Sequence, residues 1–364
     1  EEIEEIIDHT PMDGIASHFE SEENVDFSVE RVNPPNREVE LERIRILREN
    51  IGRNYTLNRK QMVAYEMATE NVIKRYLKEK TEQLIGYVGG PGGTGKSQVI
   101  KAIVNFHEEM NVKASLKMCA NTGTAAKHIG GNTTTTLFGF CSKKSEKLQQ
   151  KFEKVNTIIV DEVSMIGCLQ IVRISRSLSK GKCVDPSIPF GGVDMIFFGD
   201  FIQFPPVKDS PLYCGWNETH NKSNTRKAEI DKQLGIHLWK QVNKIVLLTE
   251  QMRCTDNAYR ELLNRLREGK CTDRDVEMLN GRIVGHSVDL TSIVDTPIIT
   301  PGNQLVMAIN ELFVNQYSQQ TRIYVSTAVD YVGRKNNRKQ VPKRVAEKMK
   351  NWANTATRGL PREL

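Results

Sequence analysis

The sequence predicts an α/β fold built on a parallel β-sheet, and two observations carry this prediction. Short apolar runs alternate with helix-like stretches, at residues 84–88, 112–119, 155–160, 193–198, 245–248 and 297–300. Runs of this length, rich in β-branched residues, are typical of strands buried on both faces of a sheet. In addition, a glycine-rich motif at residues 90–97 stands between one such run and a helix-like segment at residues 97–109. Strand, loop and helix in this order are the context that a phosphate-binding loop requires.

The length and composition indicate a globular protein. The chain has 364 residues, enough for about two domains of ordinary size. Hydrophobic residues make up 38% and charged residues 26%, which argues against a disordered or fibrous chain. We expect no membrane segment, because no run of eighteen apolar residues occurs and no signal-peptide pattern opens the sequence. Seven scattered cysteines without a Cys-x-x-Cys pair favour a reduced, intracellular protein.

Charge is distributed unevenly along the chain. The net charge is +6, but residues 1–50 carry 15 acidic and 5 basic side chains, whereas residues 321–364 carry 3 acidic and 11 basic ones. We expect residues 1–50 to form an acidic N-terminal extension. The residues between these two segments have a net charge of +8. A basic body permits nucleic-acid binding, although solvated charged faces are the commoner explanation of such a surplus.

Two regions have a helical period outside the alternation of strands and helices. From Gln61 to residue 77, apolar residues recur every three or four positions, as in an amphipathic surface helix. Residues 256–280 show apolar residues on one helical face, a stop at Gly269 and a capping-box-like start at Thr272. We expect a helical hairpin there, joining two domains.

The motif at residues 90–97 fits G-x-x-x-x-G-K-[ST] at every fixed position. Its glycines let the backbone curl so that successive N–H groups and a helix N-terminus face a phosphate. The lysine adds a positive charge at the outer phosphates, and the hydroxyl that follows can bind Mg²⁺. An incidental glycine-rich turn is the alternative, which the complete fit disfavours. The expected nucleotide-binding residues are Gly90, Gly92, Gly93, Thr94, Gly95, Lys96 and Ser97.

A pair of carboxylates, Asp161 and Glu162, follows the apolar run at residues 155–160. Neighbouring strand residues point to opposite sides, so the two cannot do the same job unless the chain turns between them. We expect Asp161 to reach the metal, directly or through water, and Glu162 to polarise the attacking water. An isolated Asp-Glu pair is more often a solvated loop, but the buried strand and the upstream motif favour a catalytic pair.

Three further residues are weaker candidates on their own. Gln203 follows the run at residues 193–198, where an amide is suited to sensing a γ-phosphate, although a strand-end cap is equally reasonable. Arg253 is suited to stabilising charge in phosphoryl transfer, but an ion-pair role is commoner. The carboxamide of Gln61 matches the donor and acceptor edge of adenine. No Asn-Lys-x-Asp motif occurs, which argues against a GTPase.

These elements, in this order, resemble the Pif (petite-integration-frequency) family of superfamily-one DNA helicases, particularly its Helitron-transposon-like branch. The resemblance runs from about residue 57 to residue 310. The PFGG element before GDF separates this family from other ATPases with the same phosphate motif. Besides the features above, the resemblance rests on TGTAA at residues 122–126 with GG at 130–131, PFGG at 189–192, GDFIQFPP at 199–206, EQMR at 250–253 and PIITPGN at 297–303.

The resemblance implies a domain order and an activity. It implies a RecA-like P-loop ATPase domain at residues 51–255, a helical connector at 256–294 and the beginning of a second RecA-like domain at 295–364. The implied activity is that of an ATP- and Mg²⁺-dependent helicase that moves 5′ to 3′ on single-stranded DNA and acts at duplex junctions. Such a helicase is expected to work as a monomer in repair, recombination or telomere maintenance, in the nucleus or else in the mitochondrion.

The same resemblance implies individual roles. Lys96, Ser97, Asp161 and Glu162 keep the phosphate, metal and water roles given above. Gln61 resembles the adenine reader, Gln203 the γ-phosphate sensor, and Arg253 the arginine at the domain interface. Hydroxyls and backbone N–H groups suit DNA phosphates without base readout. The residues that match the family's DNA contacts are Thr122, Gly123, Thr133 and Thr135.

Two departures from the family pattern bear on these expectations. Thr135 stands where the family commonly has a histidine, so a DNA contact by that imidazole is in doubt. The later motifs of the second domain do not occur before Leu364, and the first residue is Glu1 rather than Met. We therefore expect a C-terminally truncated member of the family. The alternative is a non-catalytic, nucleotide-gated DNA-binding or scaffold module.

Overall fold

The computed structural model describes residues 37–140, 145–215, 226–283, 296–318, 331–334 and 337–340. The chain forms two compact units, Glu1–Cys271 and Thr272–Leu364. We call them the first and the second unit and describe each by itself.

The first unit is built on a six-stranded sheet in the order β3-β2-β4-β5-β1-β6, in which every neighbouring pair is parallel. The central strands β4 and β5 are buried along their whole length, as their unbroken apolar sequences predict. This confirms the predicted parallel α/β sheet. The strands are β1 (Ile85–Gly89), β2 (Leu116–Ala120), β3 (Asn132–Thr133), β4 (Thr157–Asp161), β5 (Asp194–Gly199) and β6 (Lys244–Leu247).

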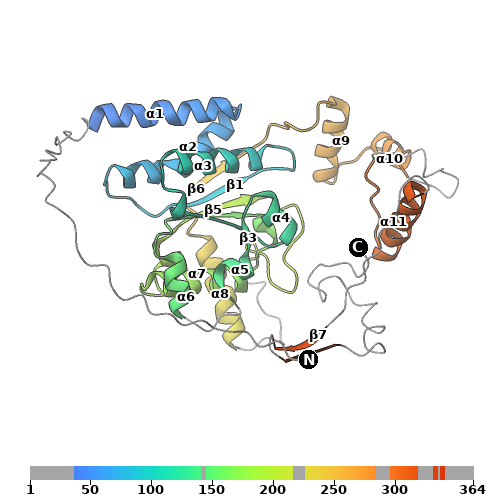
Figure 1. Ribbon diagram of the computed structural model, residues 1–364. Helices are drawn as coiled ribbons and strands as arrows, with labels where there is room; N and C mark the ends of the chain where they lie inside the picture. Colours follow the sequence, from blue (N-terminus) through green and yellow to red (C-terminus); the bar gives the residue numbers. More distant parts are fainter. Residues whose placement is uncertain are drawn as a thin grey trace, which may run out of the picture. The chain divides into compact units, whose positions relative to one another are not determined.

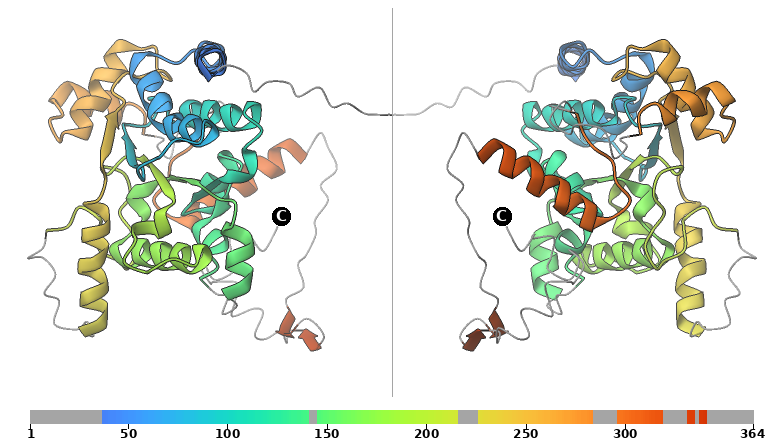
Figure 2. Two further views of the ribbon diagram at one scale, coloured as in Figure 1. Left: turned by 90° about the vertical axis from the view of Figure 1, so that its left-hand side faces the viewer. Right: turned by 90° about the vertical axis from the view of Figure 1, so that its right-hand side faces the viewer.

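Helices cover both faces of this sheet (Figure 1), and the views in Figure 2 show the same two layers. One face carries α1 (Arg37–Asn54), α2 (Arg59–Tyr76) and α3 (Lys96–Glu109). The other face carries α6 (Ser145–Phe152), α7 (Cys168–Lys182) and α8 (Arg226–Trp239). The shorter elements are α4 (Gly123–His128), α5 (Thr134–Phe138), α9 (Asn257–Arg267) and the single turns η1 (Lys113–Ser115), η2 (Val163–Met165) and η3 (Pro189–Gly192).

Each face of the sheet has its own apolar core, because successive strand residues alternate between the two faces. Ile159 and Phe198 belong to the core under α1 to α3, whereas Ile158 and Phe197 belong to the core under α6 to α8. All four side chains are fully buried. Burying a side chain of this size contributes about 1.5–3 kcal/mol. The paired cores fix the strands, and with them the loops at the strand ends.

The predicted amphipathic helix after Gln61 is α2, and its N-terminus is tightly defined. The Asn58 side chain accepts a hydrogen bond from the Gln61 backbone N–H, and the Gln61 side chain accepts one from the Asn58 backbone N–H, each at 2.9 Å. This capping box satisfies two of the N–H groups that a helix start leaves unpaired. It also places Gln61 in the first turn, next to the phosphate-binding loop.

The second unit contains two described helices, α10 (Asp273–Asn280) and α11 (Asn303–Ser318), and an antiparallel pair, β7 (Tyr331–Arg334) and β8 (Asn337–Gln340). Thr272 starts α10 with the predicted type of capping box. The strand predicted at residues 297–300 is wrong, because these residues have no regular structure and Ile299 is 96% exposed. Prolines at positions 297 and 301 lack the N–H that a sheet requires.

The observed boundaries differ from the expected ones in two places. Residues 37–50 were expected in the acidic extension, but they form most of α1, whose Ile44 is completely buried in the core of the first unit. The expected connector at residues 256–294 is divided in sequence between the two units, because the first unit ends at Cys271 and the second begins at Thr272. Residues 1–36 and 284–295 lie outside the described residues.

Among the described helices, none has both the length and the apolar character required to cross a bilayer.

Candidate active site at the carboxyl ends of the strands

The phosphate-binding motif forms the loop between β1 and α3. Gly93 and Gly95 have φ angles of +87° and +82°, which glycine adopts without strain. Gly95 is the N-cap of α3, so Lys96 and Ser97 lie in its first turn. The Thr94 hydroxyl donates to the Pro91 carbonyl at 2.9 Å and closes the loop. The positive end of the α3 dipole therefore lies at the loop, as an anion site needs.

Lys96 is folded back onto its own loop. Its Nζ donates to the carbonyl oxygens of Gly90 at 2.7 Å and Pro91 at 3.0 Å. Burial lowers the pKa of Lys96, against the opposing effect of three nearby carboxylates. A phosphate entering the loop would replace two neutral acceptors with a charged one, and charge-assisted hydrogen bonds are the stronger kind.

Asp161 and Glu162 stand at the end of β4, where the chain turns. Asp161 is 7% exposed, and Glu162 has φ +54° and ψ +48° just before η2 begins. The turn is stabilised by a hydrogen bond of 2.9 Å from the Glu162 N–H to Asp161 Oδ1. Because the chain turns at Glu162, which has a left-handed conformation, the two neighbouring carboxylates can serve one site.

Both carboxyl groups are electrostatically unusual. Burial raises the pKa of Asp161, and burial together with the charge of Asp161 raises the pKa of Glu162. Carboxyl groups whose pKa values are shifted in this way occur often at functional sites. The pair is therefore suited to proton transfer or to binding a cation, and the structure brings it near the charge of Lys96.

A third carboxylate, Asp200, follows the end of β5 and is 3% exposed. Sequence reasoning chose Gln203 in this segment, but Gln203 is exposed in a turn, whereas Asp200 was missed. The guanidinium of Arg267 donates to both oxygens of Asp200 at 2.5 Å. Burial alone would raise the pKa of Asp200, but the hydrogen bonds and charge of Arg267 outweigh it and hold the pKa below its ordinary value.

The segment after β6 crosses the phosphate-binding loop, and we call residues 249–253 the strap. The Gln251 side chain donates to the Gly92 carbonyl, and the Met252 N–H donates to the Gly93 carbonyl, each at 2.8 Å. A Cβ atom on Gly93 would overlap with the Gln251 side chain. The Arg253 N–H donates to Gln251 Oε1 at 3.1 Å, and Arg253 is exposed. Sequence reasoning identified Arg253 but missed Gln251.

The N-terminus of α2 braces the other side of the loop. Gln61 is 2% exposed, and its Nε2 donates to the Thr94 carbonyl at 3.0 Å. A Cβ atom on Gly95 would overlap with this amide. Asn58 in turn donates to the Glu250 carboxylate of the strap at 2.9 Å. The start of α2, the loop and the strap thus form one hydrogen-bonded assembly.

Comparison with known proteins identifies the family to which this chain belongs. The model of the PIF1-like helicase family matches residues 56–277 of this chain, a stretch that contains the loop, the three carboxylates and the strap. The chain belongs to the PIF1-like helicase family. The resemblance to this family stated from the sequence is therefore confirmed, and the Helitron-like branch stays a prediction.

Named relatives in this family are ATP-dependent DNA helicases. Pif1 of Bdellovibrio bacteriovorus is 29% identical over 217 residues, which are 56% of this chain and 44% of that protein. RRM3 of Saccharomyces cerevisiae is 27% identical over 265 residues, which are 65% of this chain and 34% of that protein. This chain therefore spans less than half the length of either relative.

Solved Pif1 helicases share the fold. The Candida albicans structure has a TM-score of 0.53 at 20% identity and covers 85% of this chain and 62% of that one. A Bacteroides Pif1 structure, in complex with ADP-AlF3 and single-stranded DNA, has a TM-score of 0.50 at 24% identity and covers 74% and 61%. The predicted RecA-like fold is confirmed by this likeness.

Within this PIF1-like chain, the four residues expected to touch DNA lie on the β2 and β3 side of the sheet. Thr122 and Thr133 are the N-caps of α4 and α5, and their hydroxyls accept backbone N–H groups. Gly123 and Thr135 are exposed. Because the strands are parallel, these residues stand at the same edge as the phosphate-binding loop. Their contact with DNA stays a prediction.

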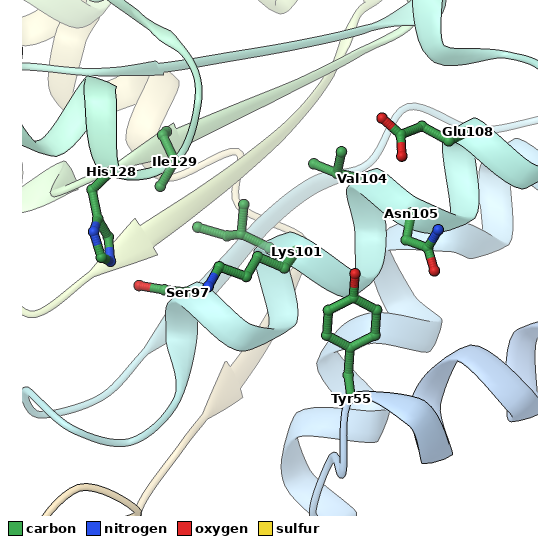
Figure 3. A pocket seen from close by; sticks show the side chains of 9 residues that line it. Tyr55, Ser97, Lys101, Val104, Asn105, Glu108, His128 and Ile129 are labelled. Carbon is green, nitrogen blue, oxygen red and sulfur yellow. The ribbon is translucent and has the colours of Figure 1, made fainter.

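A pocket of about 240 Å³ runs along α3 of the PIF1-like chain, beginning at the first turn (Figure 3). Ser97 and His128 lie toward one end, and Tyr55 and Asn105 toward the other. Ser97 directly follows Lys96 in the first turn of α3, so this end of the pocket begins at the phosphate-binding loop. The lining residues are Tyr55, Ser97, Ile100, Lys101, Val104, Asn105, Glu108, His128 and Ile129.

Proposed function

We propose that this chain is the ATP-hydrolysing part of a DNA helicase that moves 5′ to 3′ along single-stranded DNA. The observation that carries the proposal is the convergence of Lys96, Asp161 and Glu162 at the glycine-rich loop, which combines an anion site with two carboxylates of raised pKa. A nucleoside triphosphate fits this combination because its phosphates need cations and its hydrolysis needs a base. Relatives named as ATP-dependent DNA helicases support the same activity.

The residues of the loop would bind and orient the phosphates. Lys96 would exchange the carbonyls of Gly90 and Pro91 for the outer phosphates, and the N-terminus of α3 would face them. Glu162 would hold the attacking water and accept its proton, which a carboxyl of raised pKa does more readily near neutral pH. Asp161, which pins the turn before Glu162, would keep both groups aimed at the same place.

Ser97 and Asp161 fit a Mg²⁺ ion that arrives with the nucleotide. A hydroxyl and a carboxylate are hard oxygen ligands, and Mg²⁺ commonly takes one or two of these beside phosphate oxygens and water. No group of three or more His, Cys, Asp or Glu side chains is arranged for a metal in the described part of the chain. Bound there, the ion would neutralise charge on the phosphates.

Three roles that the resemblance implies are retained in the proposal. Gln203 would sense the γ-phosphate, and Arg253 would act at the interface between domains; both side chains are exposed in segments that follow strand ends. Gln61 would read adenine. An amide nitrogen carries two N–H groups, so the bond from Gln61 to the Thr94 carbonyl leaves one for a base.

DNA would bind through its backbone at Thr122, Gly123, Thr133 and Thr135. The net charge of +8 on the residues between the two charged ends supports an electrostatic interaction. We expect binding with little sequence preference, whose logarithmic affinity falls linearly with the logarithm of salt concentration. A flat response between about 50 and 200 mM salt would argue against this interface. We further propose that the protein acts as a monomer at duplex junctions in genome maintenance, in the nucleus or the mitochondrion.

The test is an ATPase assay with and without single-stranded DNA. The proposal predicts ATP hydrolysis that DNA stimulates severalfold. Tight ATP binding without turnover would instead indicate a nucleotide-gated DNA-binding module. Absence of both binding and turnover would contradict a nucleotide function at this loop.

A further inference from the structure

The ends of β4 and β5 crowd three carboxylates around one lysine. Gly199, which directly precedes Asp200, pairs with Gly89 at the end of β1 and accepts a hydrogen bond from the Gly90 N–H at 3.2 Å, so Asp200 stands beside the phosphate-binding loop. Asp161 and Glu162 stand at the end of the neighbouring strand β4, and all three carboxylates act on Lys96. Asp161 and Asp200 are 7% and 3% exposed, so water screens them weakly. Lys96 by itself balances only one of these three charges. A polyanionic nucleotide entering such a site would meet an excess of negative charge.

Arg267 supplies a second positive charge at this place. It is the last residue of α9, and its Nη1 and Nη2 each donate to a different oxygen of Asp200 at 2.5 Å. The arginine side chain is 27% exposed. Its charge also lowers the pKa of Lys96, so the guanidinium lies within electrostatic reach of the phosphate-binding loop.

The pair differs from the other ion pairs of α9. Arg265, two residues earlier, pairs with Glu261 of the same helix at 3.7 Å, and both side chains are substantially exposed. A pair of that kind contributes little. A buried ion pair is also weak evidence for stability, because desolvation offsets the attraction. The location of the Arg267 pair beside Lys96, rather than its strength, is what points to a role in the site.

We propose that Arg267 is a positioning residue of the nucleotide site: it neutralises Asp200, so that the loop around Lys96 can accept a triphosphate, and it anchors the end of α9 at the strand end beside the loop. This inference rests on the proposed ATP-binding function and adds a residue to it. Arg267 acts through Asp200 and is distinct from Arg253, whose side chain belongs to the strap.

The experiment is equilibrium binding of MgATP to a set of matched variants of the whole chain. Arg267→Gln should weaken binding by at least about tenfold, because Asp200 is left as an unbalanced buried charge. Asp200→Asn combined with Arg267→Gln should restore binding to within about threefold of the wild type, because both charges are gone. Arg267→Lys should keep most of the affinity, and the surface control Arg265→Gln should bind like the wild type.

Each outcome decides the inference. If the double variant binds as weakly as Arg267→Gln, the charge of Asp200 is not what the arginine controls, and the proposal is wrong. Unchanged binding by a folded Arg267→Gln variant would also overturn it. If that variant fails to fold, the double variant and Arg267→Lys still give the comparison. A wild type that binds MgATP while the variants do not differ would refute this inference alone, whereas a wild type that binds none would refute the proposed function as well.

Discussion

The two sides of the phosphate-binding loop use different chemistry. On the charged side, the carboxyl groups of Asp161, Glu162 and Asp200 lie at the ends of the buried strands β4 and β5, and the pKa of each is displaced from its usual value. Arg267, the last residue of α9, pairs with Asp200. On the amide side, the side chains of Asn58, Gln61 and Gln251 hydrogen-bond to the loop, the helix start and the strap.

The two sides of the loop therefore have different expected roles, one in the reaction and in charge balance, the other in holding the loop in shape. Carboxyl groups with displaced pKa values can hold a proton or a cation, so substitution of Asp161 or Glu162 should change turnover, whereas substitution of Arg267 should change nucleotide binding through Asp200. Neutral amides already paired within the chain hold the loop in shape, so substitutions on the amide side should change nucleotide affinity or stability.

Glu162→Gln should have the largest effect. We expect the turnover rate for ATP to fall by about 10²–10⁴-fold, because an amide cannot accept the proton of the attacking water. MgATP affinity should stay within a few fold of the wild type. Steady-state hydrolysis and equilibrium binding measure the two quantities. A loss of affinity equal to the loss of turnover would show that Glu162 acts in binding.

The pH dependence of hydrolysis should follow the same group. Burial and the charge of Asp161 raise the pKa of Glu162 above its ordinary value, so activity should begin to fall on acidification at a pH above the ordinary carboxylate range. Acidification should have the opposite effect on the stability of the fold. A carboxyl whose folded pKa is raised binds its proton more tightly in the folded state, so acidification through that pKa stabilises the nucleotide-free fold.

Rate profiles and thermal unfolding of the wild type and Glu162→Gln would check both signs. The variant should lose the acid limb contributed by Glu162. Identical profiles in the two proteins would assign that limb to a different group.

Gln251→Ala tests the amide side. The variant loses the hydrogen bond to the Gly92 carbonyl, which is worth about 1 kcal/mol, so we expect MgATP affinity to fall by about fivefold with turnover at saturation nearly unchanged. The KM and kcat for ATP separate these effects. A matched control is Gln241→Ala, whose side chain contacts His237 at the end of α8. A drop in kcat without a change in KM would break the proposed division.

Asn58→Ala should have the smallest effect. Loss of an N-cap costs about 1 kcal/mol of stability, which lowers the Tm by about 2–4 °C in a domain of this size. Thr272→Ala removes the equivalent cap from α10 in the second unit and serves as the control. Only Asn58→Ala should also weaken nucleotide binding, because Asn58 bonds to the strap. Equal nucleotide affinity in the two variants would show that Asn58 does not support nucleotide binding.

The sequence predicts the phosphate-binding loop and the carboxylates at the end of β4 better than the long-range pairings around them, for a physical reason. Fixed spacing within the loop and an apolar run before Asp161 are local signals, so the loop, β4 and the helix after the loop are predictable. The bond between Gln251 and Gly92 joins positions 159 residues apart, and that between Arg267 and Asp200 joins positions 67 apart. No period or motif in a single sequence reports such pairings.

One local signal for Arg267 was nevertheless present. Asp200 directly follows a buried strand, and a carboxylate in that position requires a cation or hydrogen-bond donors. Two differences between the observed strands and the predicted ones have local causes of their own. The two-residue β3 is too short to leave an alternating pattern, and the apolar residues at 297–300 satisfy composition but stand between prolines and find no partner strand in the described part of the chain.

The most direct test of the central claim is a calorimetric titration of MgATP into the wild type and Lys96→Ala. We predict one nucleotide bound per wild-type chain and binding at least about tenfold weaker in the variant, because Lys96 loses its charge-assisted bonds to phosphate. Thermal unfolding of the nucleotide-free proteins should match within a few degrees. Equal affinity in two folded proteins would contradict the assignment of this loop as the nucleotide site.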